Sequence, residues 1–255
     1  MLEAEIRKRR AARGSDDLLL MTHIVLGYPN LAASREIALR MAEAGVDMME
    51  LQIPFSEPIA DGPVILHANQ GALAAGIDVQ ACFELAAELA RELPIPLLFM
   101  TYYNIVWKRG IARFAADMRA AGLRGAIIPD LPFEEGSELL TTFKEQALDP
   151  IFIYSPTTSD ARMRQIAEHA RGFVYCVARK GVTGTNTSFD TLGDYLARCR
   201  SATSLPLAVG FGVQTRADVA ALRGHADIAV VGSETIRLVE RHGVAAVSDF
   251  IRGLR

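Results

Sequence analysis

Short apolar runs alternate with amphipathic stretches along nearly the whole chain. A short apolar run bounded by turn residues is typical of a strand buried on both faces, whereas apolar positions three and four residues apart predict a helix. We expect strands at residues 19–25, 48–51, 97–100, 125–128, 150–153, 173–177, 207–209 and 228–231. We expect helices at 32–44, 80–91, 111–121, 134–146, 160–169, 190–200, 215–222, 233–241 and 244–255, with a short N-terminal helix around Leu2 and Ile6.

The order of these elements predicts the fold class. Repeated strand-then-helix units with fully buried strands favour a parallel sheet, and eight such units favour closure into a barrel. We therefore predict a single (β/α)8 TIM-barrel domain over residues 1–255 with an extra N-terminal helix. An open, doubly wound sheet is the alternative, but no glycine-rich dinucleotide fingerprint follows the first strand.

Two connections are longer than barrel loops usually are. They lie at roughly 53–79 and 179–189, and both leave the carboxyl end of a predicted strand, where barrel enzymes carry their sites. The second contains Gly181 and Gly184, which give a closing loop the backbone freedom that it needs. We expect both connections to act as lids.

The second predicted strand leads into two carboxylates. Glu50 stands within an apolar run, and Asp61 follows in a loop with several prolines and a glycine. A buried carboxylate is costly unless it is paired or used. Two carboxyl groups in different surroundings favour acid/base chemistry. A structural glutamate in an ion pair and an aspartate in a turn are the alternative.

The ends of the last two strands have the composition of a phosphate site. Gly212 and Gly232 let backbone N–H groups approach an anion, Ser233 adds a hydroxyl at a helix start, and Gly184 could close over the same group. The alternative treats the glycines as tight turns and Ser233 as a helix N-cap. Glu234 speaks against phosphate unless it points outward.

Other strand ends supply side chains for a flat aromatic substrate held by a few polar anchors. The polar ones are Tyr102, Asn104, Asp130 and Tyr175, and the apolar ones are Phe99, Met100, Ile127, Ile153 and Phe211. His23 lies in the middle of the first strand, where it could face the pocket, but we expect it to pack as a neutral core residue.

Composition excludes several other classes of function. The net charge is −3 and the charges are interspersed, so we expect neither nucleic-acid nor membrane binding. The longest apolar run, 18–26, is too short to span a bilayer and has no signal-cleavage pattern. The histidines show no metal-ligand spacing, and three cysteines, Cys82, Cys176 and Cys199, predict buried free thiols in a reducing cytoplasm.

Nearly the entire chain resembles the tryptophan synthase alpha subunit family. Besides Glu50, the matching stretches are Leu26-Gly-Tyr-Pro29, Pro54-Phe-Ser-Glu-Pro-Ile-Ala-Asp-Gly-Pro63, Met100-Thr-Tyr-Tyr-Asn104, Ile128-Pro-Asp-Leu-Pro132, Pro156-Thr-Thr158, Gly172-Phe-Val-Tyr175, Gly181-Val-Thr-Gly184, Gly210-Phe-Gly212 and Gly232-Ser233. The segment 54–63 and the segment 181–184 are highly specific to the family, and their order and spacing fit it.

The resemblance implies a carbon–carbon lyase that cleaves indole-3-glycerol phosphate into indole and glyceraldehyde 3-phosphate, without a cofactor of its own. Glu50 would be the acid/base at the ring carbon and the reacting hydroxyl, and Asp61 would accept a hydrogen bond from the indole N–H. The phosphate would bind at Gly184, Gly212, Gly232 and Ser233, and Tyr175, Tyr102, Phe211, Met100 and Ile127 would surround the rest. If so, Glu50→Gln nearly abolishes cleavage and leaves phosphate-ligand affinity largely intact.

The resemblance also implies a partner. The family works in the cytoplasm with a beta subunit that carries pyridoxal phosphate and receives indole through a tunnel, as an alpha2beta2 heterotetramer. The loop from Pro54 to Asp61 would form part of that contact. This chain departs from the family at Gln52 (usually glycine), Glu57 (more often aspartate), His23 (apolar in the family), Glu234 (a small residue), Lys180 and the segment 185–189.

Two other functions stay open at the level of sequence. A Schiff-base aldolase would use Lys180, just beyond the sixth strand, although a lysine in a glycine-flanked loop is hard to desolvate. A barrel kept only to activate a beta-type subunit would explain the departures but not the retained Glu50 and Asp61. The assignment requires those two side chains to share one pocket, with Glu50 not locked in an internal salt bridge.

Overall fold

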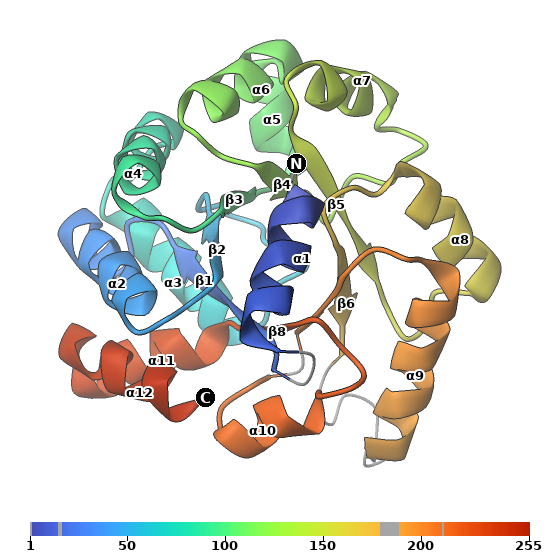
Figure 1. Ribbon diagram of the computed structural model, residues 1–255. Helices are drawn as coiled ribbons and strands as arrows, with labels where there is room; N and C mark the ends of the chain where they lie inside the picture. Colours follow the sequence, from blue (N-terminus) through green and yellow to red (C-terminus); the bar gives the residue numbers. More distant parts are fainter. Residues whose placement is uncertain (1, 15–16, 179–188, 211) are drawn as a thin grey trace.

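The computed structural model describes residues 2–14, 17–178, 189–210 and 212–255, with the side chains of 189–191 left aside. Its strands form a closed barrel in chain order, and every neighbouring pair is parallel. Pairing of β1 with β8, where Met21 lies opposite Val230, closes the ring (Figure 1). The strands are β1 (Leu19–Val25), β2 (Met48–Gln52), β3 (Leu97–Met100), β4 (Gly125–Ile127), β5 (Asp149–Tyr154), β6 (Val174–Val177), β7 (Leu207–Gly210) and β8 (Ile228–Val231).

The predicted barrel is therefore confirmed, and all eight predicted strands are present within two residues at either end. An outer ring of helices surrounds the strands (Figure 1). The helices are α1 (Leu2–Arg13), α2 (Leu31–Glu43), α3 (Pro63–Ala74), α4 (Val79–Glu92), α5 (Tyr103–Arg109), α6 (Ile111–Ala120), α7 (Ser137–Glu145), α8 (Asp160–His169), α9 (Phe189–Ala202), α10 (Arg216–Ala221), α11 (Ser233–His242) and α12 (Val247–Gly253), with a 3-10 turn at Val244–Ala246.

The long connection after β2 is not one loop, as the sequence suggested, because it contains α3. This helix starts at Pro63 with Gly62 as its N-cap, so the proline and glycine that predict a loop instead mark a helix start. Helix α5 was likewise not predicted, since it is only seven residues long. The segment 179–188, the other expected lid, lies outside the described residues.

Apolar side chains form two layers around the strands. An outer layer packs strands against helices and includes Phe99, which contacts Phe83 and Phe114 edge-on or tilted. An inner layer fills the barrel and includes Met21, Met48 and Phe173. Phe99 was expected near a substrate, but alternation along β3 turns it toward the helices instead.

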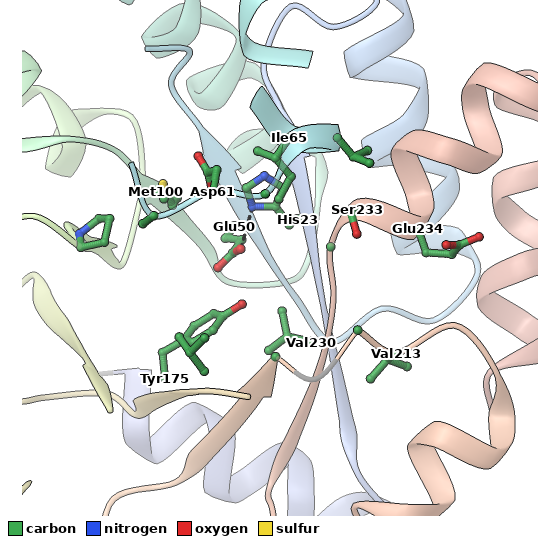
Figure 2. A pocket seen from close by; sticks show the side chains of 18 of the residues that line it. His23, Glu50, Asp61, Ile65, Met100, Tyr175, Val213, Val230, Ser233 and Glu234 are labelled. Atoms are coloured by element: carbon green, nitrogen blue, oxygen red, sulfur yellow. Dashed lines mark hydrogen bonds and ion pairs between the residues drawn. The ribbon is translucent and has the colours of Figure 1, made fainter. Parts of the chain in front are cut away.

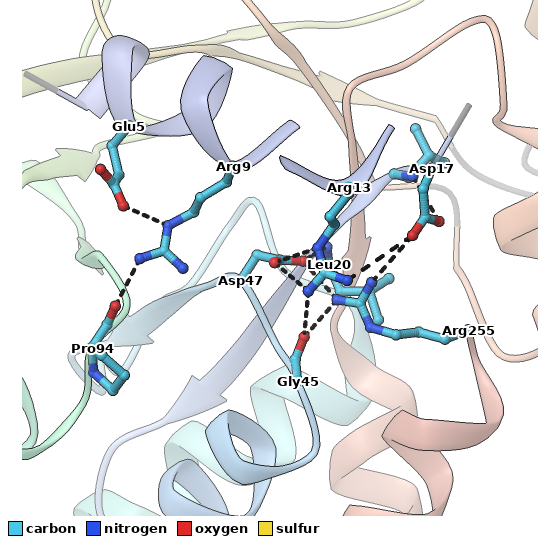
Figure 3. A network of polar contacts seen from close by, with 10 residues as sticks. Glu5, Arg9, Arg13, Asp17, Leu20, Gly45, Asp47, Pro94 and Arg255 are labelled. Atoms are coloured by element: carbon cyan, nitrogen blue, oxygen red, sulfur yellow. Dashed lines mark hydrogen bonds and ion pairs between the residues drawn. The ribbon is translucent and has the colours of Figure 1, made fainter. Parts of the chain in front are cut away.

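Helix α1 covers the end of the barrel at which the strands begin. Its Leu2 and Ile6 join the inner apolar layer, and it crosses the ring of strands in Figure 1. Polar contacts tie it to the strand starts. In Figure 3, Arg13 and Arg255 meet at the buried carboxylate of Asp47, just before β2, and Arg9 connects Glu5 to the Pro94 carbonyl oxygen. This end is closed and crosslinked, so the site must lie at the opposite end.

Candidate active site

A cavity of about 440 Å³ opens at the carboxyl end of the strands, a volume within the usual range for small-molecule sites. Each strand of the barrel contributes at least one of the residues that line it, among them His23, Glu50, Met100, Ile127, Ile153, Tyr175, Gly210 and Val230. Asp61, Gly212, Gly232 and Ser233 complete the wall from the connecting segments. Figure 2 shows Glu50, His23 and Asp61 gathered on one side of this cavity.

Glu50 points into the barrel because alternation along β2 places it on the same face as Met48 and Gln52. Its carboxylate is buried, and one oxygen, Oε1, lies 2.6 Å from Nδ1 of His23. The other oxygen, Oε2, has no hydrogen-bond partner among the described residues. Half of this carboxylate is therefore held by the protein, and half is available to a ligand.

The expectation that His23 packs as a neutral core residue is wrong. Its ring lies in the cavity wall, on β1, directly opposite Glu50 in the strand register. Burial alone would lower the pKa of His23, but the hydrogen bond and charge of Glu50 raise it, as do Asp61 and Gln52, and the net pKa is raised. Sequence could not reveal this contact, since both faces of β1 are buried and either could have held the ring.

The condition that Glu50 be free of an internal salt bridge is met only in part. His23 occupies Oε1, whereas Oε2 has no described partner and the residue lines the cavity. The condition that Glu50 and Asp61 share one pocket is met in full.

Asp61 lies between β2 and α3, and two side chains that do not line the cavity, Gln52 and Tyr102, hold its carboxylate. Gln52 Nε2 donates to Oδ2 over 2.7 Å, and the Tyr102 hydroxyl donates to the same oxygen over 3.1 Å. The backbone N–H of Ala60 donates to Tyr102, whose ring stacks on Phe55 with centroids 5.1 Å apart. Both side-chain bonds use Oδ2, so Oδ1 remains for a ligand.

Tyr102 does not line the cavity, contrary to its predicted place against the substrate. It is buried behind Asp61, and burial, followed by the Asp61 charge, raises the pKa of its hydroxyl. Asn104 and Asp130 also stay outside the cavity wall. Asp130 instead accepts the backbone N–H of Tyr103 at the start of α5.

Tyr175 faces the carboxylates from the other side of the cavity (Figure 2). Burial raises the pKa of its hydroxyl well above the usual value, and the charges of Glu50 and Asp61 add to this effect. The position depends on Gly210, because a Cβ there would stand 2.8 Å from the Tyr175 hydroxyl oxygen. With Met100, Ile127, Ile153 and Val230, Tyr175 forms an apolar slot beside the two carboxylates.

The far side of the cavity is formed by glycines and the start of α11. Gly212 has a φ of +71°, which strongly favours glycine, and Gly232 caps α11 without any side-chain hydrogen bond. Ser233 is the first residue of the helix, so its reading as the N-cap is wrong. The orphan N–H groups of this helix start and the Ser233 hydroxyl face the cavity region and suit an anion.

Arg237 is a cavity residue that the sequence analysis missed. Its Nη1 donates to Glu234 over 2.9 Å and lies 3.4 Å from the Ser233 hydroxyl oxygen. The one signal for it was its spacing, four residues after Ser233 on a predicted helix. The ion pair neutralises Glu234, which removes the objection that a lone carboxylate would repel a phosphate here.

Three predicted residues, Gly184, Phe211 and Lys180, lie outside the described residues, and so does the segment 185–188. Within the described part of the chain, no group of three or more potential ligands could hold a metal ion. No described helix is long and apolar enough to cross a bilayer. Cys82, Cys176 and Cys199 are buried free thiols, as expected.

Comparisons with known proteins agree with this geometry. A family model described as the tryptophan synthase alpha chain matches residues 10–251. The tryptophan synthase alpha chain of Syntrophotalea carbinolica is 58% identical over 256 residues, which cover 100% of both chains. A chain in the crystal structure of tryptophan synthase from M. tuberculosis has a TM-score of 0.90 and 29% identity, covering 99% of this chain and 97% of that one. A chain of the tryptophan synthase complex from Pyrococcus furiosus has a TM-score of 0.85 and 30% identity, covering 94% and 98%.

Proposed function

The chain belongs to the tryptophan synthase alpha chain family, and we propose that its Glu50 and Asp61 carry out the cleavage of indole-3-glycerol phosphate in the cavity of Figure 2. The reaction of this family is a retro-aldol cleavage that yields indole and glyceraldehyde 3-phosphate. The observation that carries the residue assignment is that both carboxylates open into one cavity that also contains a helix start suited to phosphate.

Glu50 performs both proton transfers. As a carboxylic acid, it gives its proton to the ring carbon that bears the glycerol chain. As a carboxylate, it then takes the proton of the hydroxyl on the neighbouring chain carbon. The carbon–carbon bond breaks, its electrons return to the ring as indole, the chain leaves as the aldehyde, and Glu50 is protonated again. The free Oε2 is the atom suited to this exchange, since His23 holds Oε1.

Asp61 stabilises the charge that develops on the ring. Protonation of the ring carbon places positive charge on the indole nitrogen, and a carboxylate that accepts its N–H lowers the energy of that intermediate. Gln52 and Tyr102 keep Oδ2 in place, so Asp61 is already positioned before the substrate binds. The apolar slot of Met100, Ile127 and Tyr175 would hold the indole ring.

Phosphate binding orients the substrate from the far end. Gly212, Gly232, Ser233 and the start of α11 would hold the phosphate, and Gly184 and Phe211 remain part of the proposed site on the resemblance alone. Binding energy from this remote group places the reacting carbon at Glu50.

The test compares Glu50→Gln with Glu138→Gln, an exposed residue of α7 outside the cavity. Release of indole from indole-3-glycerol phosphate is measured with and without a beta subunit, together with the affinity for glycerol 3-phosphate. We expect Glu50→Gln to lose cleavage and keep ligand affinity, and Glu138→Gln to change neither. An active Glu50→Gln enzyme would overturn the assignment.

A beta subunit is the partner that the family implies, in an alpha2beta2 assembly in the cytoplasm, with pyridoxal phosphate bound only by that partner. Two exposed apolar side chains support a docking surface beside the active-site loop. Ile59, two residues before Asp61, is 80% exposed, and Trp107 of α5 is 68% exposed. Trp107→Ala should weaken activation by a beta subunit and leave cleavage by the isolated chain unchanged. Equal activation of both forms would exclude this surface.

A further inference from the structure

Two polar residues lie between the catalytic carboxylates proposed above. His23 of β1 contacts Glu50 over 2.6 Å, and Gln52 of β2 contacts Asp61 over 2.7 Å. All four side chains are on the inner face of the barrel or border it, at its carboxyl end.

The unpaired atoms of His23 and Gln52 are complementary. Nε2 of His23 and Oε1 of Gln52 are both buried, and neither has a partner that meets hydrogen-bond geometry among the described residues. One is a ring nitrogen that donates when protonated, and the other is an amide oxygen that accepts. The Gln52 side chain contributes to raising the pKa of His23, which requires its oxygen to lie near the ring.

We propose that His23 and Gln52 are positioning residues that form a polar bridge, Glu50–His23–Gln52–Asp61, through which the proton held at Glu50 is coupled to the charge on Asp61. This inference rests on the proposed roles of Glu50 and Asp61. The bridge fixes one oxygen of each carboxylate and leaves the other, Glu50 Oε2 and Asp61 Oδ1, toward the substrate.

The bridge also determines where the reacting proton resides. The His23–Glu50 pair holds one acidic proton. On the imidazole it leaves an ion pair, and on the free oxygen Oε2, with Oε1 still accepting from His23, it is placed to protonate the ring carbon. A negative charge on Asp61, reached through Gln52, favours retention of that proton. The His23–Glu50 pair therefore keeps its acidic proton at pH values below the raised pKa of His23 and loses it at pH values above that pKa.

The groups around His23 do not offer another origin for such a pH dependence. Glu50 and Asp61 face it from β2 and the following loop, and both raise its pKa. Tyr175 faces Glu50 from β6, and burial keeps its pKa well above the usual value. Tyr28 and His23 both line a second, small cavity, and the pKa of Tyr28 is raised to about 12 by burial and by its hydrogen bond to Glu240. Neither tyrosine titrates near neutral pH.

The first experiment records the pH profile of kcat/KM for cleavage in three variants. His23→Phe removes the bridge, His23→Asn keeps an amide donor near the Nδ1 position but cannot titrate, and His225→Asn changes an exposed histidine outside the cavity. We expect the basic limb to move to lower pH by about one unit or more in both His23 variants and to stay in place in His225→Asn. His23→Asn should keep more of the activity at low pH than His23→Phe, and its retained hydrogen bond guards against a simple loss of folding.

The second experiment follows the His23 ring by ¹⁵N NMR, which reports protonation without reference to activity. We expect a pKa above the ordinary histidine value of about 6.5, which falls in Glu50→Gln. Asp61→Asn should also lower it, and the size of that effect should drop by about half or more in a Gln52→Gly background, because the two sites are then uncoupled.

These outcomes separate the bridge from the proposed function. If both His23 variants keep the basic limb of the unaltered protein while Glu50→Gln is inactive, the bridge is wrong and the roles of Glu50 and Asp61 stand. If Asp61→Asn shifts His23 equally with and without Gln52, the coupling does not pass through Gln52 and the proposal fails. If Glu50→Gln is active, the proposed function fails first.

Discussion

Asp47, directly before β2, and Glu50, in the middle of that strand, are buried carboxylates three residues apart. Asp47 has both oxygens occupied: Oδ1 accepts from Arg13, and Oδ2 accepts from the backbone N–H of Leu20 and from Arg255 (Figure 3). Glu50 has one oxygen against His23 and the other without a described partner (Figure 2).

The fully paired Asp47 is suited to a structural role, and the half-paired Glu50 is suited to a functional one. A buried polar atom without a partner costs about 1–3 kcal/mol of folding free energy. At the closed end both oxygens of Asp47 are paired, whereas Glu50 Oε2, His23 Nε2 and Gln52 Oε1 remain without a described partner at the open end. A site that leaves polar atoms unpaired in the free protein can use them on a substrate, and the crosslinked end supplies the stability that this requires.

The largest effect is expected at Glu50. In Glu50→Gln the amide cannot shuttle a proton, so cleavage should fall by at least about 10³-fold, near the upper range for loss of a general acid/base. The free energy of unfolding should change by less than about 1 kcal/mol, since the amide keeps the shape and a contact to His23. Urea denaturation and an indole assay measure the two quantities. A strongly destabilised Glu50→Gln protein would make this carboxylate structural, like Asp47, and remove the contrast.

Asp61→Asn should come next. Because Gln52 and Tyr102 both donate to Oδ2, the carbonyl oxygen of an asparagine would turn toward them. Its NH2 group would then face the substrate N–H, so the variant loses both the charge and the acceptor. We expect cleavage to fall by about 10²-fold or more, comparable to removal of one preorganised electrostatic partner. Loss of less than about threefold would show that Asp61 does not face the ring nitrogen.

Such details mark the limit of what the sequence could predict. Buried runs bounded by turn residues were enough for the strands, and the position of Glu50 on β2 and of Asp61 after it was enough to place both at one end of a barrel. The sequence could not decide which face of β1 turns inward, because both are buried, and so His23 was assigned to the core. The sequence also placed Tyr102 against the substrate. Its ring does lie on the inner side of the barrel, but it stacks on Phe55 and contacts the substrate site through Asp61.

The missed helix and the missed arginine have a different cause. Helix α3 follows a stretch rich in proline and glycine and contains Gly71, so its local composition is that of a loop, while its contacts with α11 and β1 hold it in place. Arg237 lies one helical turn after Ser233, so their contact is local, but its place in the cavity wall depends on where packing sets the start of α11. In both cases the decisive step is packing against other segments, which local composition does not encode.

Asp47→Asn tests the closed end. The amide would present N–H groups to donors on Arg13, Arg255 and Leu20, so at least one bond to a charged group is lost. We expect the free energy of unfolding to drop by about 2 kcal/mol, with cleavage per folded molecule unchanged. Urea denaturation gives the first quantity, and the indole assay at low temperature gives the second. A variant that is fully stable but inactive would reverse the proposed division between the two ends.

The smallest effect is expected at the phosphate end, where one ion pair is partly exposed. Nη1 of Arg237 donates to the Glu234 carboxylate over 2.9 Å, and the arginine also lies beside Ser233. The guanidinium is therefore shared between this carboxylate and the proposed phosphate site. Glu234→Gln should free Arg237 for the ligand and lower KM for indole-3-glycerol phosphate about threefold, in keeping with the small energy of exposed pairs, while kcat stays unchanged. The gain should shrink with added salt and vanish in Glu234→Gln/Arg237→Ala, because exposed charges are screened and the effect needs the arginine. Since the carboxyl chemistry at Glu50 is untouched, a change in kcat instead of KM would place Arg237 outside phosphate recognition.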